Sequence, residues 1–382
     1  MGNSADIVIV GGAVVGSSVA AHLVGLGFRG RVVVIEPDPT YARAATALSA
    51  SGIRRQFSNP LNVRISGYGL EVIRALGLSF HEHGYLYLAA TEAQAGMLRA
   101  NHAVQRAEGA DVELLEPAAL AERFPHLETG DLKLAAHGLR GEGWFDNMGL
   151  LTAFRTQARA GGVAYRRDRV VRVDAARGWV TAVGLESGAT LACGALVNAA
   201  GCQGAEIARL AGFPLPVERR KRTVFAFASA TPPRGRLPLT IDPSGVWFRP
   251  EGDRYIASCA PSPDPAVAAD DFEPRHAEWE EVVWPALAAR SRAFEALKLM
   301  RFWAGHYDMN TLDHNVVVGP HPEVANFHFA NGFSGHGLQQ APAIGRGLAE
   351  LLVHGAYRSL DLSPLGYGRI ASGEPFPEAA II

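Results

Sequence analysis

The sequence predicts a two-domain α/β (α+β) fold, in which a domain with a parallel βαβ core is joined to a domain built on an antiparallel sheet. Two patterns predict it. The chain opens with a short apolar run, a glycine-rich turn, a helical pattern and a second apolar run, which is the order of a βαβ unit. The middle of the chain alternates apolar and polar residues, as in an antiparallel sheet with one face in water. At 382 residues the chain is also longer than one domain usually is.

The elements of the parallel domain come from separate parts of the chain. In order, we expect a strand at 7–10, a turn at 11–16, a helix at 17–26, strands at 32–36, 195–198 and 316–319, and a helix at 339–352. The strand at 195–198 ends in Ala199-Ala200-Gly201, and the strand at 316–319 precedes a glycine-rich loop. The domain is therefore predicted to be discontinuous and to comprise residues 1–80, 145–215 and 303–382.

The antiparallel domain is predicted from alternating segments and one covering helix. We expect strands at 84–88 and 223–227, a hairpin that pairs 246–249 with 255–257, and a helix at 276–289. This domain would comprise residues 81–144 and 216–302 and would face the substrate.

Composition excludes several function classes. A formal net charge of −2, from 36 basic and 38 acidic residues, gives no field that would gather nucleic acid or an anionic membrane. The cysteines Cys193, Cys202 and Cys259 follow no metal-ligand spacing, so we expect no bound metal and no disulfide framework. Export signals and apolar runs of about 20 residues are absent from the sequence. We therefore expect a cytoplasmic protein with no membrane span; its oligomeric state is open.

The first turn predicts a dinucleotide site. Gly11-Gly12-Ala13-Val14-Val15-Gly16 is close to G-x-G-x-x-G, follows a strand and opens a helix. The helix N-terminus would offer unpaired N–H groups to phosphates, and Glu36, followed by Pro37, would accept a hydrogen bond from a ribose hydroxyl. Ala13 replaces the middle glycine, and its methyl group narrows the approach of the pyrophosphate. This Rossmann-like pattern does not distinguish FAD from NAD.

A late glycine-rich loop favours a flavin. Gly332-Phe333-Ser334-Gly335-His336-Gly337-Leu338-Gln339 permits close backbone approach, and the helix after it points its N-terminus back at the bound group. Reduced flavin carries negative charge near N1 and O2, which a helix N-terminus stabilises. The sequence therefore predicts FAD.

These motifs resemble the D-amino-acid oxidase superfamily, especially its sarcosine oxidase, dimethylglycine dehydrogenase and glycine oxidase branches. The resemblance spans nearly the whole chain. It is carried by the first turn with Glu36, by Ser49-Ala50-Ser51-Gly52-Ile53-Arg54, by Asn198-Ala199-Ala200-Gly201, by Trp303-Ala304-Gly305, and by Gly332-Phe333-Ser334-Gly335-His336-Gly337. It implies that the adenosine half of FAD lies along the first turn, and that the flavin lies between the loop at 49–55 and the last two motifs. We expect Val170 to contact the cofactor as well.

Three departures from the family pattern are informative. Monomeric sarcosine oxidases attach flavin through a cysteine in the stretch that corresponds to 305–312, and this chain has none there, so we expect non-covalent FAD. Gln339 stands where those proteins have a lysine near the flavin. Tyr307 stands where glycine oxidases have a carboxylate-binding arginine, which leaves that role unassigned.

Hydride transfer from an amine C–H requires a well-positioned, desolvated and neutral amine more than a strong base. We therefore expect the site to contain side chains that hold the substrate and aromatic side chains that exclude water. The predicted catalytic residues are Arg54, Trp247, Arg249, His306, Tyr307 and His336. Arg54, or Arg55 beside it, would fork onto a substrate carboxylate or a flavin carbonyl. Trp247 and Arg249 share a strand face. For either histidine, a packed structural role is the alternative.

The sequence thus predicts an FAD-dependent oxidoreductase that converts a small carboxylated amine, either an N-methyl or secondary amino acid or a D-amino acid, to an imine that water hydrolyses. Oxygen or an acceptor protein or quinone would reoxidise the flavin; the three lysines, none placed beside the flavin, favour a dehydrogenase. A 2-hydroxy-acid or glycerol-phosphate dehydrogenase is the second interpretation, and a non-catalytic flavoprotein assembly factor is the third. The run Arg219-Arg220-Lys221-Arg222 predicts an electrostatic patch or a solvated strand edge.

Overall fold

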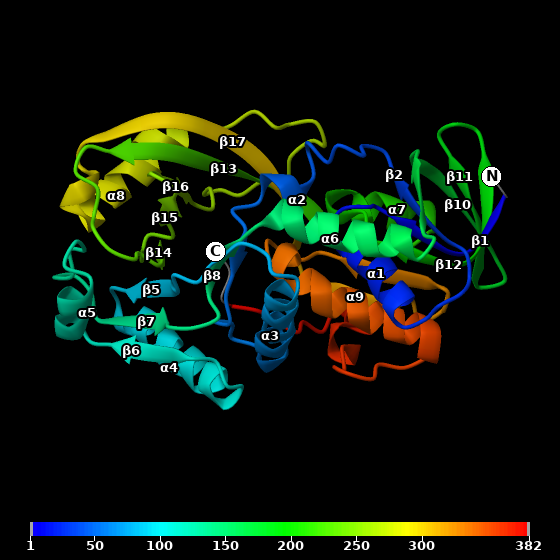
Figure 1. Cartoon of the computed structure of the whole chain (residues 1–382), viewed down its shortest axis with the longest axis horizontal. Coiled ribbons are helices and arrows are strands. Elements are labelled where there is room, and N and C mark those ends of the chain that lie inside the picture. Colours follow the sequence, from blue (N-terminus) through cyan, green and yellow to red (C-terminus); the bar gives the residue numbers. More distant parts are fainter. Residues whose placement is uncertain (1–2, 380–382) are drawn as a thin grey trace.

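The computed structural model describes residues 3–379 and shows an elongated molecule with a large sheet in each half (Figure 1). The first sheet contains eight strands: β1 (Ser4–Val10), β2 (Val32–Glu36), β9 (Ala164–Arg167), β10 (Val170–Ala176), β11 (Trp179–Leu185), β12 (Thr190–Asn198), β18 (Val317–Pro320) and β19 (Phe327–Asn331). Strands β12, β1, β2 and β9 are neighbours in that order and run parallel. Two antiparallel strands, β10 and β11, extend the sheet beyond β12.

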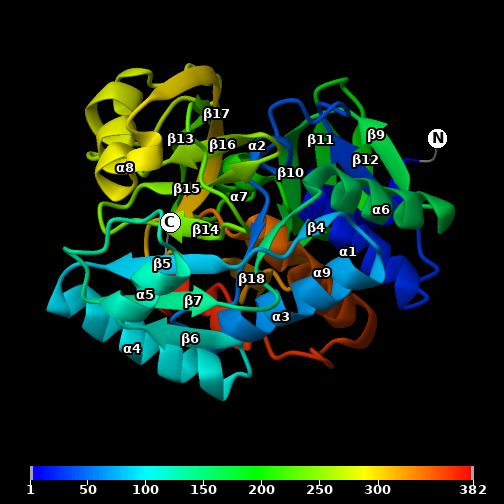
Figure 2. The ribbon, with the colours of Figure 1, turned by 60° about the vertical axis from the view of Figure 1, so that its left-hand side comes forward.

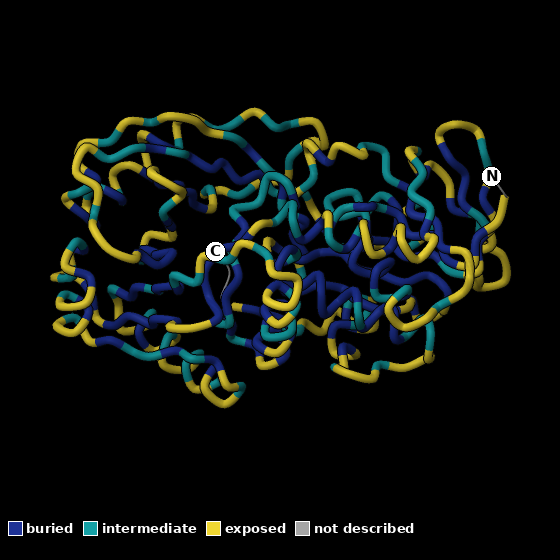
Figure 3. The backbone as a smooth tube through the Cα atoms, in the orientation of Figure 1, coloured by how far each residue is buried: buried dark blue, intermediate teal, exposed yellow. Residues whose placement is uncertain are grey.

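Helices cover both faces of the first sheet. The helices of this half are α1 (Val14–Gly25), α2 (Ala45–Leu48), α3 (Pro60–Ala75), α6 (Asn147–Ala160), α7 (Gly204–Leu210), α9 (Gly337–His354), α10 (Gly368–Ser372) and the 3-10 turns η1 (Gly201–Gln203) and η4 (Ser363–Leu365). Successive residues of β1 alternate between two cores: Ile7 and Ile9 pack with α1, α6 and α9, while Val8 and Val10 pack on the face of α7. Because both faces are buried there, residues 7–10 of β1 are a continuous apolar run. In Figure 3, which colours the backbone by burial, the central strands of this sheet are mostly buried.

The second sheet also has eight strands, in the order β17-β13-β16-β15-β14-β5-β7-β6. Its strands are β5 (Tyr85–Ala89), β6 (Val112–Leu115), β7 (Leu134–Gly138), β13 (Val217–Ser229), β14 (Leu239–Ile241), β15 (Trp247–Glu251), β16 (Arg254–Ser258) and β17 (Leu297–Asn310). Its covering helices are α4 (Glu92–Ala107), α5 (Pro117–Arg123), the π-helix η2 (Trp279–Val283), α8 (Trp284–Arg290) and the 3-10 turn η3 (Arg292–Phe294). All its pairings are antiparallel except β14 with β5. Figure 2 shows α4 and α5 beside β5–β7.

A small third sheet links the two halves. It pairs β8 (Gly143–Phe145) with β3 (Gly52–Ile53) and β4 (Phe80–His81). Strand β3 follows the loop at 49–51, so this sheet fixes the chain where the two large sheets meet. Among residues 3–379, no helix has both the length and the apolar composition needed to cross a bilayer.

The α/β fold with a parallel nucleotide-type sheet and a mainly antiparallel second sheet is confirmed, and the structure adds three details. The strand predicted at 316–319 is β18, but it lies antiparallel at the end of the sheet. Parallel strand β19, which the sequence analysis missed, leads into the glycine-rich loop instead. Strand β17 also crosses the predicted domain boundary at 303, because it stays paired with β13 as far as Asn310.

Candidate active site

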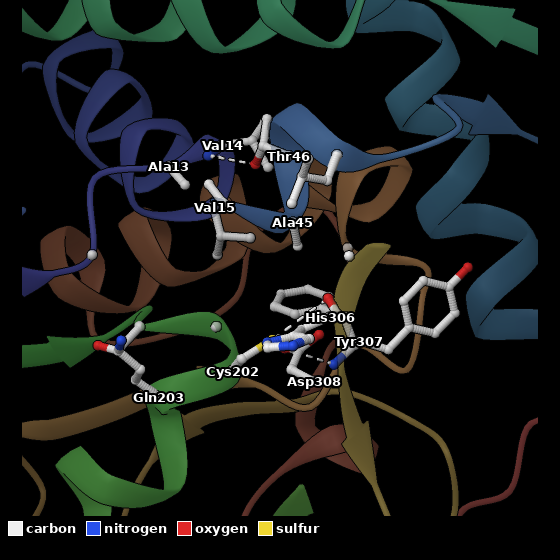
Figure 4. A pocket seen from close by; sticks show the side chains of 18 of the residues that line it. Ala13, Val14, Val15, Ala45, Thr46, Cys202, Gln203, His306, Tyr307 and Asp308 are labelled. Carbon is white, nitrogen blue, oxygen red and sulfur yellow. Dashed lines mark hydrogen bonds between the residues drawn. The ribbon is translucent and has the colours of Figure 1, made fainter. Parts of the chain in front are cut away.

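A cavity of about 1100 Å³ is walled by both large sheets. Its lining runs from the turn after β1 and the end of β2, past the end of β12 and the start of α9, to β13, β15 and β17. Figure 4 shows Ala13, Val15 and Ala45 on one side of this space and Cys202 and His306 on the other. Pockets for small molecules usually measure about 300–1,000 Å³. The cavity therefore has room for a dinucleotide and a second small ligand.

The turn after β1 can only be made with glycine at two positions. Gly11 has a φ of +96°, and a Cβ there would lie 2.4 Å from the carbonyl oxygen of Ala199. A Cβ on Gly16 would lie 1.9 Å from the carbonyl oxygen of Gly11. Gly16 and Gly12 do not line the cavity; they allow the turn to close behind it. Gly11, Ala13, Val14 and Val15 do line it.

Helix α1 opens its N-terminus on the cavity. The N-cap residue is Ala13, whose side chain makes no capping hydrogen bond, and the first turn of the helix carries no acidic residue. The N–H of Val14 makes a long 3.4 Å hydrogen bond to Thr46 Oγ1 (Figure 4). A helix end of this kind is a binding site for phosphate oxygens.

Glu36 closes the nucleotide end of the cavity, beside Pro37. Its Oε2 accepts a hydrogen bond from Gly12 N at 2.8 Å, and its Oε1 accepts one from Asp38 N at 2.8 Å. Burial raises the pKa of Glu36, while these two N–H groups act against the shift. Each carboxylate oxygen keeps acceptor capacity for a ligand hydroxyl. Val170 lines the same end.

The glycine-rich loop before α9 is held by Asp308 of β17. Its Oδ2 accepts hydrogen bonds from Gly332 N at 3.0 Å and Phe333 N at 3.2 Å. Burial raises the pKa of Asp308 to about 6. Ser334 Oγ accepts from Asn310 N at 3.0 Å. Gly332 and Ser334 thus shape the loop from behind and do not line the cavity.

The remaining predicted cofactor residues line the cavity. They are Ser49, Ala50, Ser51 and Gly52 on one wall, Ala199, Ala200, Gly201 and Gly305 on another, and Phe333, Gly335, His336, Gly337, Leu338 and Gln339 around the start of α9. Gln339 Oε1 accepts a hydrogen bond from Arg54 N at 2.9 Å, so its side chain ties the loop at 49–55 to α9.

Arg54 and His336 form a contact inside the cavity wall. Arg54 is buried, its Nη2 lies 3.0 Å from His336 Nε2, and its guanidinium lies 4.5 Å from the ring centre of Phe57. Burial and the charge of Arg54 hold the pKa of His336 well below its usual range. His336 is therefore neutral, and its Nε2 lone pair accepts from the arginine. Arg55 faces elsewhere and donates to the carbonyl oxygens of Glu108 and Gly109.

Trp247 and Arg249 take different positions. Trp247 lines the cavity, whereas Arg249 does not. The buried guanidinium of Arg249 lies 4.7 Å from the ring centre of Trp144, and its Nη2 donates to the carbonyl oxygen of Ala50 at 2.8 Å. Arg249 also pairs with Glu251. Its position is that of a residue that holds the loop at 49–52, and the prediction of direct substrate contact was wrong.

His306 and Tyr307 both line the cavity. His306 Nε2 bonds to the carbonyl oxygen of Asp271 at 2.7 Å, and its ring stacks on Phe272 at 4.1 Å. Burial lowers the pKa of His306. The ring of Tyr307 packs on Gly335, where a Cβ would lie 2.4 Å from it, and its other neighbour is the guanidinium of Arg222 at 5.1 Å.

Sequence reasoning missed several lining segments. They are residues 43–46 with Leu48, Cys202 with Gln203, Arg219 and Arg222 of β13, Tyr85 of β5, and Ala269, Asp270 and Phe272 of the loop before η2. Cys202 and Gln203 directly continue the predicted Ala199-Ala200-Gly201 motif, so a longer motif would have found them. No local signal marks the others.

The prediction of an electrostatic surface patch or a solvated strand edge for the basic run on β13 was wrong, because its four side chains are buried or part buried. Over this run β13 pairs with β17 on one side only, because the pairing with β16 covers Phe225–Phe227. The other side is covered by the loop before η2, which forms a bridge between Ala266 and Arg220. Each charge of the run has a carboxylate partner: Arg219 pairs with Glu206, Arg220 with Glu218, Lys221 with Asp271 and Arg222 with Asp264.

Comparison with known proteins identifies the family. Residues 6–351 match the DAO family, described as FAD dependent oxidoreductase. The chain belongs to this family. It is 41% identical to FAD-dependent oxidoreductase domain-containing protein 1 of Bos taurus, over 99% of this chain and 87% of that protein. The crystal structure of L-proline dehydrogenase from P. horikoshii has a TM-score of 0.88 at 26% identity, and covers 98% of this chain and 100% of that one. Glycine oxidase from Geobacillus kaustophilus, at 21% identity over 96% and 98% of the two chains, shares the fold with a TM-score of 0.80.

The resemblance found in the sequence is thereby confirmed, and FAD is the cofactor. The cavity fits it. The uncapped start of α1 suits the pyrophosphate, Glu36 suits a ribose hydroxyl, and the start of α9, with N-cap His336 and no acidic residue in its first turn, suits an anionic ring. The glycine at position 11 lets this turn pack against the carbonyl oxygen of Ala199, which a Cβ would approach to 2.4 Å.

Proposed function

We propose that this FAD-dependent oxidoreductase oxidises the C–N bond of a small amine that carries a carboxylate. One observation carries the proposal: beyond the start of α9, the cavity is walled by three aromatic residues, Tyr85, Trp247 and Tyr307, together with the guanidinium groups of Arg54 and Arg222. An aromatic wall excludes water and accommodates a neutral amine, and a guanidinium binds a carboxylate. When bound, FAD accepts the hydride at N5.

The protein's side chains position the substrate and keep water away from it during hydride transfer. Burial raises the pKa of Tyr85, so its phenol stays protonated and is able to donate a hydrogen bond to a ligand. The imine product leaves the aromatic wall and is hydrolysed to an oxo-acid or aldehyde and a simpler amine. The likeness to a protein described as an L-proline dehydrogenase supports a substrate of this class, because proline is a secondary amine with a carboxylate.

An anaerobic absorbance titration tests the proposal. The purified protein would be mixed with sarcosine, dimethylglycine, glycine, both enantiomers of proline, D-alanine and 2-hydroxyglutarate. We expect an amine to bleach the flavin band near about 450 nm. A flavin-loaded protein that none of the amines reduces would overturn the proposal.

A hydroxy-acid substrate is the second candidate, because two histidines line the cavity. A hydroxyl must lose a proton, which requires a base. His336 already accepts from Arg54, whereas His306 binds the carbonyl oxygen of Asp271 through Nε2 and keeps Nδ1 available. Reduction by 2-hydroxyglutarate that slows at least tenfold in His306→Gln, with amines inert, would favour this candidate. A non-catalytic flavoprotein, the third interpretation, would be supported by a cavity filled with its own side chains, and this cavity is open.

We also propose that FAD is bound non-covalently and that the protein works in a reducing compartment such as the cytoplasm, with oxygen or another acceptor reoxidising it. Cys202 lines the cavity, but burial raises the pKa of its thiol and keeps it protonated. Cys193, Cys202 and Cys259 are all free thiols. Acid precipitation should leave the flavin in the supernatant, and flavin that stays with the protein pellet would contradict non-covalent binding.

A further inference from the structure

Arg222 holds a carboxylate in the geometry that arginine uses for ligands. Its Nη1 donates to Asp264 Oδ1 and its Nη2 to Asp264 Oδ2, each at 2.8 Å. Two parallel N–H···O bonds are the strongest and most specific way in which a guanidinium binds a carboxylate. The carboxylate here belongs to the protein itself.

The two partners differ in what fixes them. Arg222 is buried on an interior strand, lines the cavity, stacks on Tyr307 at 5.1 Å and also donates from Nη1 to the carbonyl oxygen of Lys221 at 3.1 Å. Its Nε has no hydrogen-bond partner among residues 3–379. Asp264 lies on the loop between β16 and η2, and its side chain is 26% exposed. The arginine would therefore keep its place if the aspartate left for water.

The loop that carries Asp264 also covers the cavity. Its residues Ala269, Asp270 and Phe272 line the wall, and Phe272 stacks on His306. A second carboxylate of this loop, Asp271, pairs with Lys221 at 2.6 Å, but neither Asp271 nor Lys221 lines the cavity. Within residues 3–379, two ion pairs join this loop to β13, and only the pair of Arg222 with Asp264 includes a residue that lines the cavity.

We propose that Arg222 is the residue that binds the substrate carboxylate, and that Asp264 occupies its guanidinium as an internal substitute until the substrate displaces it. This inference rests on the proposed function. Two carboxylates on one buried guanidinium would repel each other, so binding is an exchange. Glu278, which is part buried just before η2 and pairs with Arg275, also faces Arg222 and adds to that repulsion. An amine without a carboxylate would not displace Asp264.

The exchange is tested on the FAD-loaded protein with a carboxylate that cannot be oxidised. Cyclopentanecarboxylate serves as the probe and cyclopentanecarboxamide as its neutral match, with dissociation constants read from the change in flavin absorbance. We expect Asp264→Asn to bind the carboxylate about tenfold more tightly, because the competing charge is gone. Asp271→Asn is the matched control: it loosens the same loop and should change the dissociation constant by less than about twofold.

Variants of the arginine complete the test. Arg222→Gln should weaken binding of the carboxylate at least tenfold and leave the carboxamide unchanged, and Arg222→Lys, which keeps the charge but loses the fork, should fall between. Equal effects of Asp264→Asn and Asp271→Asn, or no effect of Asp264→Asn, would overturn the exchange. If Arg222→Gln does not retain FAD, the comparison of Asp264→Asn with Asp271→Asn tests the exchange by itself.

The inference and the proposed function fail separately. If the binding pattern is found but no amine reduces the flavin, Arg222 is a carboxylate site and the proposed reaction is wrong. If an amino acid reduces the wild type and Arg222→Gln with the same KM, the reaction stands and the assignment of Arg222 is overturned.

Discussion

The two ends of the cavity are built in different ways. At the nucleotide end the wall is mainly backbone: the turn at 11–16, the uncapped start of α1 and the segment that follows β12. At the substrate end the wall is made of side chains whose charges are paired across long stretches of chain, such as Arg222 with Asp264. The difference shows that binding a common cofactor requires local backbone geometry, whereas selecting a substrate requires side chains that only the tertiary structure brings together.

The largest expected effect is the loss of FAD when the turn at the nucleotide end of the cavity is changed. Gly11→Ala places a methyl group 2.4 Å from a backbone oxygen at a φ of +96°, and backbone cannot move aside as a side chain can. We expect the purified variant to contain no FAD. The matched control is Gly27→Ala, which has a φ of +77° and nothing within 4 Å. Its stability should fall only by the added backbone strain, about 1–2 kcal/mol, and it should keep its FAD. A yellow Gly11→Ala protein with one FAD per chain would show that the turn is not a rigid wall.

The second prediction compares two buried carboxyl groups, those of Asp308 and Glu142. Asp308 accepts both of its backbone hydrogen bonds on Oδ2, so the single carbonyl oxygen of asparagine can replace it. Its pKa is raised to about 6, against about 3.9 when unfolded, so between these values the folded state holds a proton that the unfolded state lacks. Stability therefore falls as the pH rises from about 4 to 6, by about 2–3 kcal/mol at most. Asp308→Asn should remove this fall and stabilise the protein at pH 8, as measured by urea unfolding.

Glu142, just before β8, is the contrasting case. Burial raises its pKa to about 7, but both of its oxygens accept: Oε1 from Arg55 N at 2.7 Å and Oε2 from Gln56 Nε2 at 2.8 Å. Glutamine offers one acceptor and one donor group, so Glu142→Gln leaves a buried N–H facing another donor. We expect it to lose about 1–3 kcal/mol of stability at pH 8. Equal effects of Glu142→Gln and Asp308→Asn on stability would mean that the number of carboxylate oxygens that accept hydrogen bonds does not determine the effect of the amide substitution.

The same contrast explains which parts the sequence could predict. The turn at 11–16, Glu36 and the loop at 332–339 are contiguous patterns whose glycines have a local steric cause, and the structure brings these segments to one cavity. Arg249 was expected to contact the substrate because it shares a strand face with Trp247. Trp247 does line the cavity, whereas Arg249 is held away from it by contacts with Trp144 and Ala50, which lie far away in sequence. Arg222 was grouped with a surface run because its partner, Asp264, lies 42 residues away.

The smallest expected effect tests the one departure from the glycine pattern at the nucleotide end. Ala13 is the N-cap of α1 with a φ of −69° and a ψ of −164°, so any residue can adopt its conformation, and its methyl group faces the cavity (Figure 4). Glycine is a better N-cap than alanine, which offsets part of the greater freedom of the unfolded chain, so Ala13→Gly should cost at most about 0.5–1 kcal/mol of stability.

One methyl group is equivalent to about 0.8 kcal/mol of apolar contact, so the dissociation constant of FAD should change by no more than about fourfold in Ala13→Gly. Titration of the apoprotein with FAD, followed by quenching of flavin fluorescence, measures it. A gain of more than tenfold would mean that the methyl group obstructs the pyrophosphate, and that the backbone at this end has not relaxed around it. A loss would mean that the methyl group contacts the cofactor, so that a side chain contributes even where the wall is mainly backbone.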